Sequence, residues 1–111
     1  MSIKANLVID QGANYFSTIL LTDVDGIALD LTGYTGAAQI RKEYTSSNAA
    51  ATFTVTITAE DGQVDLSLTA AQTANLTAGE YLYDCELTQT SSNKVSRIVE
   101  GKVTVTPEIT R

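Results

Sequence analysis

The segment TAAQTANLTAGEYLYDCEL, residues 69–87, carries the clearest structural signals of this 111-residue chain. Thr69 with Gln72 three positions later predicts a capping box, in which each side chain bonds a free backbone N–H at the start of a helix. The helix is expected to be one short turn, because Ala78 and Gly79 follow it closely. Beyond Gly79 the residues alternate between two faces, with Tyr81, Tyr83, Cys85 and Leu87 on one face and Leu82, Asp84, Glu86 and Thr88 on the other. This order predicts a chain that crosses from one sheet to another and then enters a central strand.

The rest of the chain shows short β-prone segments separated by turn signals. The dipeptide Asp61-Gly62 predicts a hairpin, Gly101 predicts a bulge or bend inside the last strand, and Pro107 is expected to end it. We expect strands at residues 3–9, 14–22, 27–31, 34–44, 52–58, 63–68, 81–89 and 94–106. About eight strands with one helical turn predict an all-β, immunoglobulin-like antiparallel β-sandwich. We expect a single domain over residues 1–111, with short tails at 1–10 and 107–111. The tryptophan and the disulfide of true immunoglobulin domains are missing from the sequence.

Composition argues against several classes of function. The formal net charge is −6 and the seven basic residues are scattered, which argues against binding nucleic acid through phosphates. No apolar run approaches the length of a membrane span, and the N-terminus lacks the pattern of a signal peptide. We therefore expect neither nucleic-acid nor membrane partners.

The sequence lacks the usual catalytic constellations. It contains no histidine, which removes the commonest general base and the commonest zinc ligand. Cys85 is the single cysteine, so no intrachain disulfide can form, and its place on the apolar face favours a buried hydrophobe over a reactive thiol. We expect a non-enzyme without cofactor or metal.

Three polar or aromatic sets deserve a functional and a structural interpretation. The acidic run Asp23-Val24-Asp25-Gly26 resembles the start of a calcium loop, but it lacks enough oxygen ligands and is explained by a turn. Arg41 and Asp84 are expected to form a structural ion pair between neighbouring strands, with bidentate geometry possible. The five tyrosines could line a sugar site, although core and strand-edge positions explain them more simply.

A series of short motifs between Phe16 and Thr110 carries a family resemblance. In chain order the motifs are Asp23-Val24-Asp25-Gly26, Leu29-Asp30-Leu31-Thr32-Gly33-Tyr34, Ala38-Gln39-Ile40-Arg41, Asp61-Gly62 with Val64-Asp65-Leu66, Leu68-Thr69 leading through Thr73 and Leu76 to Gly79-Glu80-Tyr81-Leu82-Tyr83-Asp84, and Gly101-Lys102-Val103-Thr104-Val105-Thr106-Pro107. This order resembles the small β-sandwich modules of tailed-phage virion proteins. It is similar to the N-terminal module of phage baseplate upper proteins.

The resemblance implies a non-enzymatic structural protein of a tailed-phage virion, in the tail, baseplate or neck, assembled in the host cytoplasm. Such a protein would dock on other virion proteins, as a homo-oligomer or as part of a ring. The tails would supply docking strands. The docking candidates are Lys4, Asn6, Val8, Pro107, Ile109 and Arg111. The alternatives are a capsid decoration protein and a carbohydrate-binding or adhesin-like module.

Overall fold

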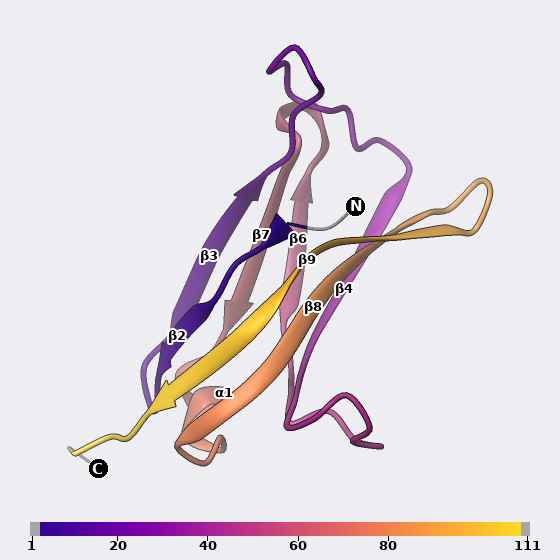
Figure 1. The fold of residues 1–111 in the computed structure, drawn as a ribbon. Coiled ribbons are helices and arrows are strands. Elements are labelled where there is room, and N and C mark those ends of the chain that lie inside the picture. Colours follow the sequence, from indigo (N-terminus) through magenta and orange to yellow (C-terminus); the bar gives the residue numbers. More distant parts are fainter. Residues whose placement is uncertain (1–2, 110–111) are drawn as a thin grey trace.

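The chain folds into two β-sheets that pack face to face (Figure 1); the structure, a computed structural model, describes residues 3–109. Within that range the larger sheet, sheet A, contains in spatial order β1 (Ile3–Lys4) and β2 (Leu7–Asp10) along one edge, then β9 (Lys94–Thr106), β8 (Gly79–Gln89), β4 (Tyr34–Arg41) and β5 (Ala51–Thr52). The smaller sheet, sheet B, contains β3 (Tyr15–Leu20), β7 (Gln63–Leu68) and β6 (Thr54–Thr58). The helical elements are the 3-10 turn η1 (Ala59–Asp61) and the helix α1 (Ala70–Ala74). The predicted all-β sandwich is confirmed.

The predicted capping box starts α1. The Thr69 hydroxyl accepts a hydrogen bond from the Gln72 backbone N–H at 3.2 Å, and the Gln72 side chain accepts one from the Thr69 N–H at 2.8 Å. Gly79 then adopts a φ of 144°, in the region that favours glycine, where the chain turns into β8. The connection carries the chain from β7 in sheet B to β8 in sheet A, as the sequence predicted.

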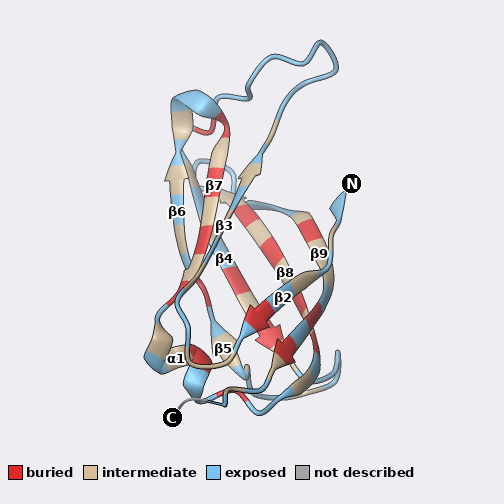
Figure 2. Cartoon of the chain, turned by 90° about the vertical axis from the view of Figure 1, so that its left-hand side faces the viewer, coloured by how far each residue is buried: buried red, intermediate tan, exposed pale blue. Residues whose placement is uncertain are grey.

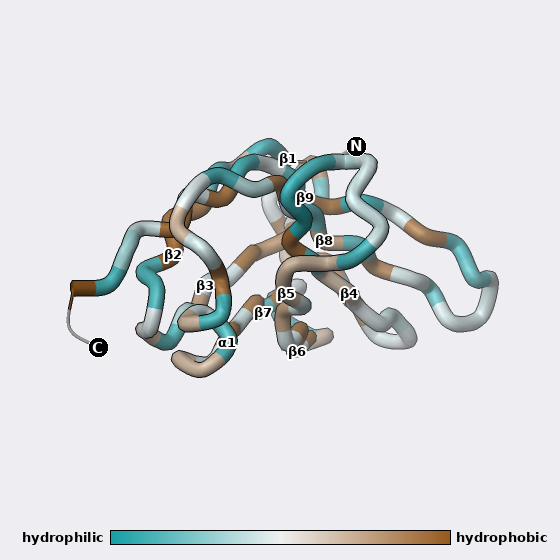
Figure 3. The backbone as a smooth tube through the Cα atoms, turned by 90° about the horizontal axis from the view of Figure 1, so that it is seen from below, coloured by the Kyte–Doolittle hydropathy of each residue, from teal (hydrophilic) through white to brown (hydrophobic). Residues whose placement is uncertain are grey.

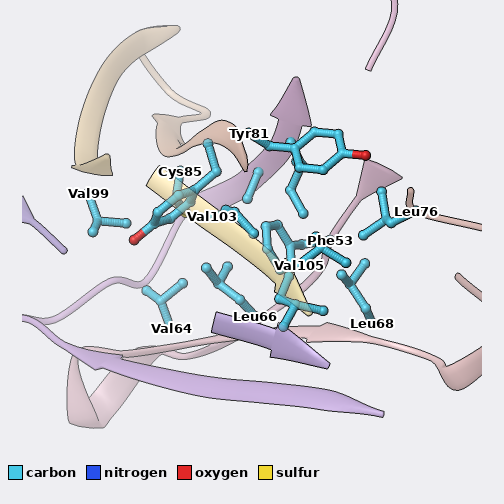
Figure 4. Close-up of a cluster of buried hydrophobic side chains, with 14 of the residues drawn as sticks. Phe53, Val64, Leu66, Leu68, Leu76, Tyr81, Cys85, Val99, Val103 and Val105 are labelled. Carbon is cyan, nitrogen blue, oxygen red and sulfur yellow. The ribbon is translucent and has the colours of Figure 1, made fainter. Parts of the chain in front are cut away.

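The core lies between the sheets and follows the alternation of β7 and β8. Tyr81, Tyr83, Cys85 and Leu87 of β8 are buried, and they face the buried Val64, Leu66 and Leu68 of β7. Figure 2 shows the resulting alternation of buried and partly exposed positions along the strands, and Figure 4 shows the side chains that meet between the layers. A buried side chain of this size contributes roughly 1.5–3 kcal/mol relative to an exposed one, so these two strands supply much of the packing free energy.

The segment expected to be one strand at residues 52–58 contributes a short strand to each sheet. Ala51 and Thr52 pair with β4 of sheet A, whereas Thr54–Thr58 pair with β7 of sheet B. Phe53 lies at the crossing, buried in the core, with its ring centroid 6.1 Å from that of Tyr15 and 6.3 Å from that of Tyr83. The alternation correctly predicted that Phe53 faces the core. It did not predict the change of sheet, because a buried aromatic residue between two strands gives the same sequence pattern as one inside a single strand.

The N-terminal strand differs from the prediction in two ways. It is divided into β1 and β2, and both run parallel to β9, so sheet A is mixed rather than purely antiparallel. At the break, the Asn6 side-chain oxygen accepts a hydrogen bond from the Lys102 N–H at 3.1 Å, which replaces a regular ladder bond. The two strands therefore form one interrupted edge of the molecule's own sheet.

Gly101 does not mark the bulge of the last strand. The register shift lies between Cys85 and Glu86 of β8, which pair with Val99 and Arg97 and leave Ile98 as the extra residue. Gly101 instead lies where the backbone of Ala5 approaches β9, and a Cβ atom there would overlap the Ala5 carbonyl oxygen. The glycine is thus required by close backbone approach, which is the other common reason for glycine in a strand.

Residues 27–31 do not form the expected strand. A single bridge joins Thr22 to Ala28, and the segment belongs to a loop at residues 22–32, which we call the distal loop. The Asp23 side chain accepts hydrogen bonds from the N–H groups of Asp25 and Ile27 at 2.8 and 3.1 Å, so the acidic run is a turn, as predicted. Ile27 and Leu29 remain exposed. Alternating apolar residues predicted a strand here, but within the described residues the segment makes only isolated backbone bonds, such as those from Leu29 to Leu21 and from Leu31 to Ala59.

Candidate functional site

A shallow depression of about 210 Å³ lies on the outer face of sheet A, the face directed away from sheet B. Side chains from three adjacent strands and from the loop after β4 line it: Gln39, Arg41, Glu43, Tyr44, Leu82, Asp84, Arg97 and Glu100. The alternation that buries the Tyr81–Leu87 face necessarily places these polar residues outside. The depression is therefore the place where the polar faces of β4, β8 and β9 meet.

The predicted ion pair between Arg41 and Asp84 is wrong, although both residues line the depression. Asp84 pairs with Arg97 of β9, with 3.2 Å between the Asp84 carboxylate and the Arg97 Nε atom, and no ion pair joins it to Arg41 within residues 3–109. Arg41 donates to the Ser46 carbonyl oxygen at 2.9 Å and to the Gln39 side chain at 2.8 Å.

Strand register explains the exchange of partners. Gln39 lies opposite Asp84 across the β4–β8 pair, and Leu82 lies opposite Arg41, so Arg41 is only a diagonal neighbour of the carboxylate. The bulge after Cys85 brings Arg97 within reach from the other side. The Arg97–Asp84 pair is solvent-exposed, so it contributes about 0–1 kcal/mol to stability.

The depression offers several hydrogen-bond donors and acceptors. The Arg41 guanidinium is fixed by two bonds and keeps further N–H groups for a ligand, and the Tyr44 ring is 81% exposed at its rim. Among residues 3–109, no group of three or more His, Cys, Asp or Glu side chains is placed to hold a metal ion. In the same range no helix is long and apolar enough to cross a membrane. These groups can bind a polar ligand or a protein surface.

Cys85 and Tyr83 lie below this face, inside the core. Burial, with smaller contributions from the charges of Asp84 and Glu86, raises the pKa of the Cys85 thiol from 9.0 to about 12. Burial also raises the pKa of Tyr83 from 10.0 to about 12, with smaller effects from Tyr15 and Cys85. Cys85 is thus a protonated core residue at neutral pH, and the neutral Tyr83 hydroxyl donates to the Ala5 carbonyl oxygen at 2.7 Å.

The predicted docking residues lie along the β1–β2 edge and the segment after β9. Lys4, Asn6 and Val8 are exposed, but their strands already pair with β9, so this segment offers only its outer edge to a partner. Pro107 is exposed directly after β9, as the prediction that it ends the strand requires, and Ile109 is 94% exposed. Arg111 lies outside the described residues.

The segment after β9 is held in place by contacts that the sequence did not indicate. The Glu108 N–H donates to the Gln11 side-chain oxygen at 3.0 Å, and the same Gln11 side chain donates to the Leu76 carbonyl oxygen at 2.7 Å. Gln11 therefore joins the β2–β3 turn, the residues after α1 and the C-terminal segment. The tail expected at residues 107–111 is therefore held against the fold as far as Glu108.

Thr73, like Gln11, makes contacts that the sequence did not indicate. Its hydroxyl is fully buried, accepts a hydrogen bond from the Gly12 N–H at 3.0 Å and donates to the Ala13 carbonyl oxygen at 2.9 Å. The Asn14 side chain adds a bond from the Ala70 N–H at 2.8 Å. We call this group of α1, the β2–β3 turn and the segment after β9 the helix end; Figure 3 views the two layers from this end.

Comparisons with known proteins bear on the fold and not on the site. No protein-family model matches the chain, and no curated protein matches it. Among solved structures, a crystal structure of InlP from Listeria monocytogenes is similar, with a TM-score of 0.51 and 16% sequence identity. The match covers 95% of this chain and 28% of the InlP chain, so the present chain spans about a quarter of that protein's length. At this identity the similarity supports a shared β-sandwich and nothing about activity.

Proposed function

We propose that this chain is a non-enzymatic structural module of a tailed-phage virion, a component of the tail, baseplate or neck that docks on other virion proteins. The observation that carries the proposal is the outer edge of β1 and β2. This edge exposes Lys4, Asn6 and Val8, and the apolar side chain of Ile109 extends into solvent beyond the end of β9. An open sheet edge with apolar side chains beside it is a surface that a strand of another protein can extend.

The residues that carry the phage-module resemblance have structural roles in this fold, which supports a docking function over a catalytic one. Asp23 closes a turn, Gly62 and Gly79 occupy backbone conformations that favour glycine, and Gly101 accommodates the approach of Ala5. A module in which the distinctive residues maintain the scaffold is expected to act through its surface.

Quantitative mass spectrometry of purified particles from the source tests the proposal. The copy number is scaled to the major capsid protein. A copy number of roughly six or a small multiple supports a symmetric tail or baseplate position. Hundreds of copies would instead indicate a capsid decoration protein. Absence from the particles would overturn the virion proposal.

Substitutions test the docking edge better than deletion of the tails does. Deleting residues 1–10 would remove Ile9, which is fully buried, and would damage the core. Val8→Asp and Ile109→Asp change exposed side chains beside the edge, and we expect both to reduce incorporation into particles. Val24→Asp is the matched control, because Val24 is exposed in the distal loop at the opposite end. Equal incorporation of all three variants would contradict docking through this edge.

The depression on sheet A favours one second candidate, a carbohydrate-binding module. An exposed tyrosine can stack on a sugar ring, and the fixed Arg41 guanidinium with the Asp84 carboxylate can bond neighbouring hydroxyl groups. We expect the isolated protein to bind a subset of glycans on an array if this candidate is correct, and Tyr44→Ala to abolish the signal. Tyr34→Ala is not a suitable control, because Tyr34 packs against the core. Ile109→Ala changes an exposed side chain away from the depression and should leave binding unchanged.

A further inference from the structure

The outer edge of β3 is an open strand edge without the usual protection. β3 borders sheet B and pairs only with β7 among the described residues, in a register without a bulge. Residues 11–22, which include the whole strand, contain no charged residue and no proline. Proteins normally guard such edges with lysine, proline, a bulge or a covering segment, because an uncharged β-prone edge pairs with other chains.

Both faces of β3 carry apolar side chains that the monomer leaves partly exposed. Phe16 and Leu20 point outward and are 65% and 63% exposed. Tyr15 and Ile19 point toward the core but remain only half-buried, whereas Val64 and Leu66 on the adjacent β7 are buried. An additional strand beside β3 would cover side chains on both faces at once.

We propose that β3 pairs antiparallel with β3 of a second copy of this chain, around a two-fold axis at Thr18. The two sheets B, of three strands each, then become one continuous sheet of six strands. In this register Phe16 of one copy lies opposite Leu20 of the other, on the outer face, and Tyr15 lies opposite Leu21. Aromatic–aliphatic cross-strand pairs of this kind stabilise antiparallel strands.

The self-complementary register favours a second copy as the occupant. The net charge of −6 on each copy opposes association, and the absence of charged residues from 11–22 keeps this repulsion low at the β3 edge. The register centred on Thr18 places Asp23 of one copy opposite Ala13 of the other, so the acidic residues that flank the strand do not face each other. The opposite edge, β6, is also uncharged, but its outward residues are the threonines Thr54, Thr56 and Thr58, which gain less from being covered.

The register of sheet B supplies a matched pair of variants. Asp65 of β7 lies between Thr18 of β3 and Thr56 of β6, and it is opposite both of them. Lysine at either position therefore gains a cross-strand partner in the monomer, which preserves the fold. Only Thr18→Lys also places two lysines face to face at the proposed axis. Sedimentation equilibrium over a concentration series, on the full chain, measures the dissociation constant of the dimer.

We expect the unmodified chain to dimerise, Thr18→Lys to weaken dimerisation about tenfold or more, and Thr56→Lys to leave it unchanged. Circular dichroism and urea unfolding check that both variants fold. A chain that stays monomeric throughout the series would overturn the proposal. If only Thr56→Lys weakens dimerisation, the contact lies at β6. If both variants weaken dimerisation equally, β3 of one copy pairs head-to-tail with β6 of the other. Either result overturns the two-fold register. The proposal does not rest on the virion role, which is tested by particle composition.

Discussion

The helix end and the distal loop lie at opposite ends of the sandwich and are held by different kinds of side-chain hydrogen bond (Figure 1). At the helix end, Gln11, Asn14 and Thr73 each bond residues that are 56 to 97 positions away in the chain. In the distal loop, Asp23 and Asp30 bond groups only two to four positions away. Backbone bonds from Leu31 to Ala59 and from Leu29 to Leu21 hold the base of the loop.

The fold depends on single side chains mainly at the helix end. A long-range side-chain bond fixes the relative position of two elements, so its loss affects the whole cooperative unit. A local bond shapes a turn that the rest of the molecule does not need. Loss of a side-chain hydrogen bond at the helix end should therefore lower the free energy of unfolding, whereas loss of one in the distal loop should change local structure only.

Thr73→Val is the strongest test of this difference. Valine keeps the shape of the side chain but leaves the Gly12 N–H and the Ala13 carbonyl oxygen without their buried partner, so we expect a loss of about 2–3 kcal/mol in unfolding free energy. Urea titration followed by tyrosine fluorescence measures it, since the chain has five tyrosines and no tryptophan. The control is Thr32→Val in the distal loop, where the lost hydroxyl bond to Asp30 is exposed and the change should stay within about 0.5 kcal/mol. Equal losses of unfolding free energy in the two variants would show that the two ends depend equally on single hydroxyl groups.

Two glycines near the distal loop differ in how closely other backbone atoms surround them. At Gly62, under the base of the distal loop, φ is 61° and an added Cβ would lie 2.9 Å from the Leu29 carbonyl oxygen. At Gly26, in the tip of the loop, φ is 80° but nothing lies within 4 Å. We expect Gly26→Ala to cost about 1–2 kcal/mol of backbone strain and Gly62→Ala to cost clearly more, in the same urea assay. If the two costs are equal, the base of the loop moves as freely as its tip.

Acid titration gives the smallest expected effect. The Thr32 hydroxyl, and then the Thr32 backbone N–H, donate to the Asp30 carboxylate and lower its pKa below the ordinary 3.8. Because the folded pKa is the lower one, this stabilisation is present above pH 3.8 and is lost as the pH falls through the folded pKa. The Thr32 amide resonance, followed by NMR, should titrate with a midpoint below 3.8. A midpoint at or above 3.8 would contradict the turn geometry.

The sequence was sufficient to predict those parts of the structure that depend on residues close together in the chain. The capping box of Thr69 and Gln72, the buried face of β8 and the Asp61-Gly62 hairpin each depend on residues a few positions apart, and all three predictions were confirmed. The buried state of Cys85 follows from the same alternation.

The sequence was insufficient wherever a partner had to be chosen across the fold. Arg41 and Asp84 were placed on the correct face, but strand register and a bulge decide which arginine reaches the carboxylate. The bonds of Thr73 join segments about 60 residues apart, and threonine in a helix carries no local sign of them. For the same reason the parallel pairing of β2 with β9 was missed, since a strand pattern does not show its direction relative to a distant partner.

That parallel pairing also determines how the molecule bears mechanical load. β2 and β9 run side by side in the same direction, joined over four residue pairs, and the chain enters β2 at one end of this contact and leaves β9 at the other. Tension applied between Ile3 and Ile109 therefore pulls along the strands and strains the hydrogen bonds of all four pairs together. Force directed across the strands would instead open them one after another. A module fixed to its surroundings through these two points would resist extension as a shear joint.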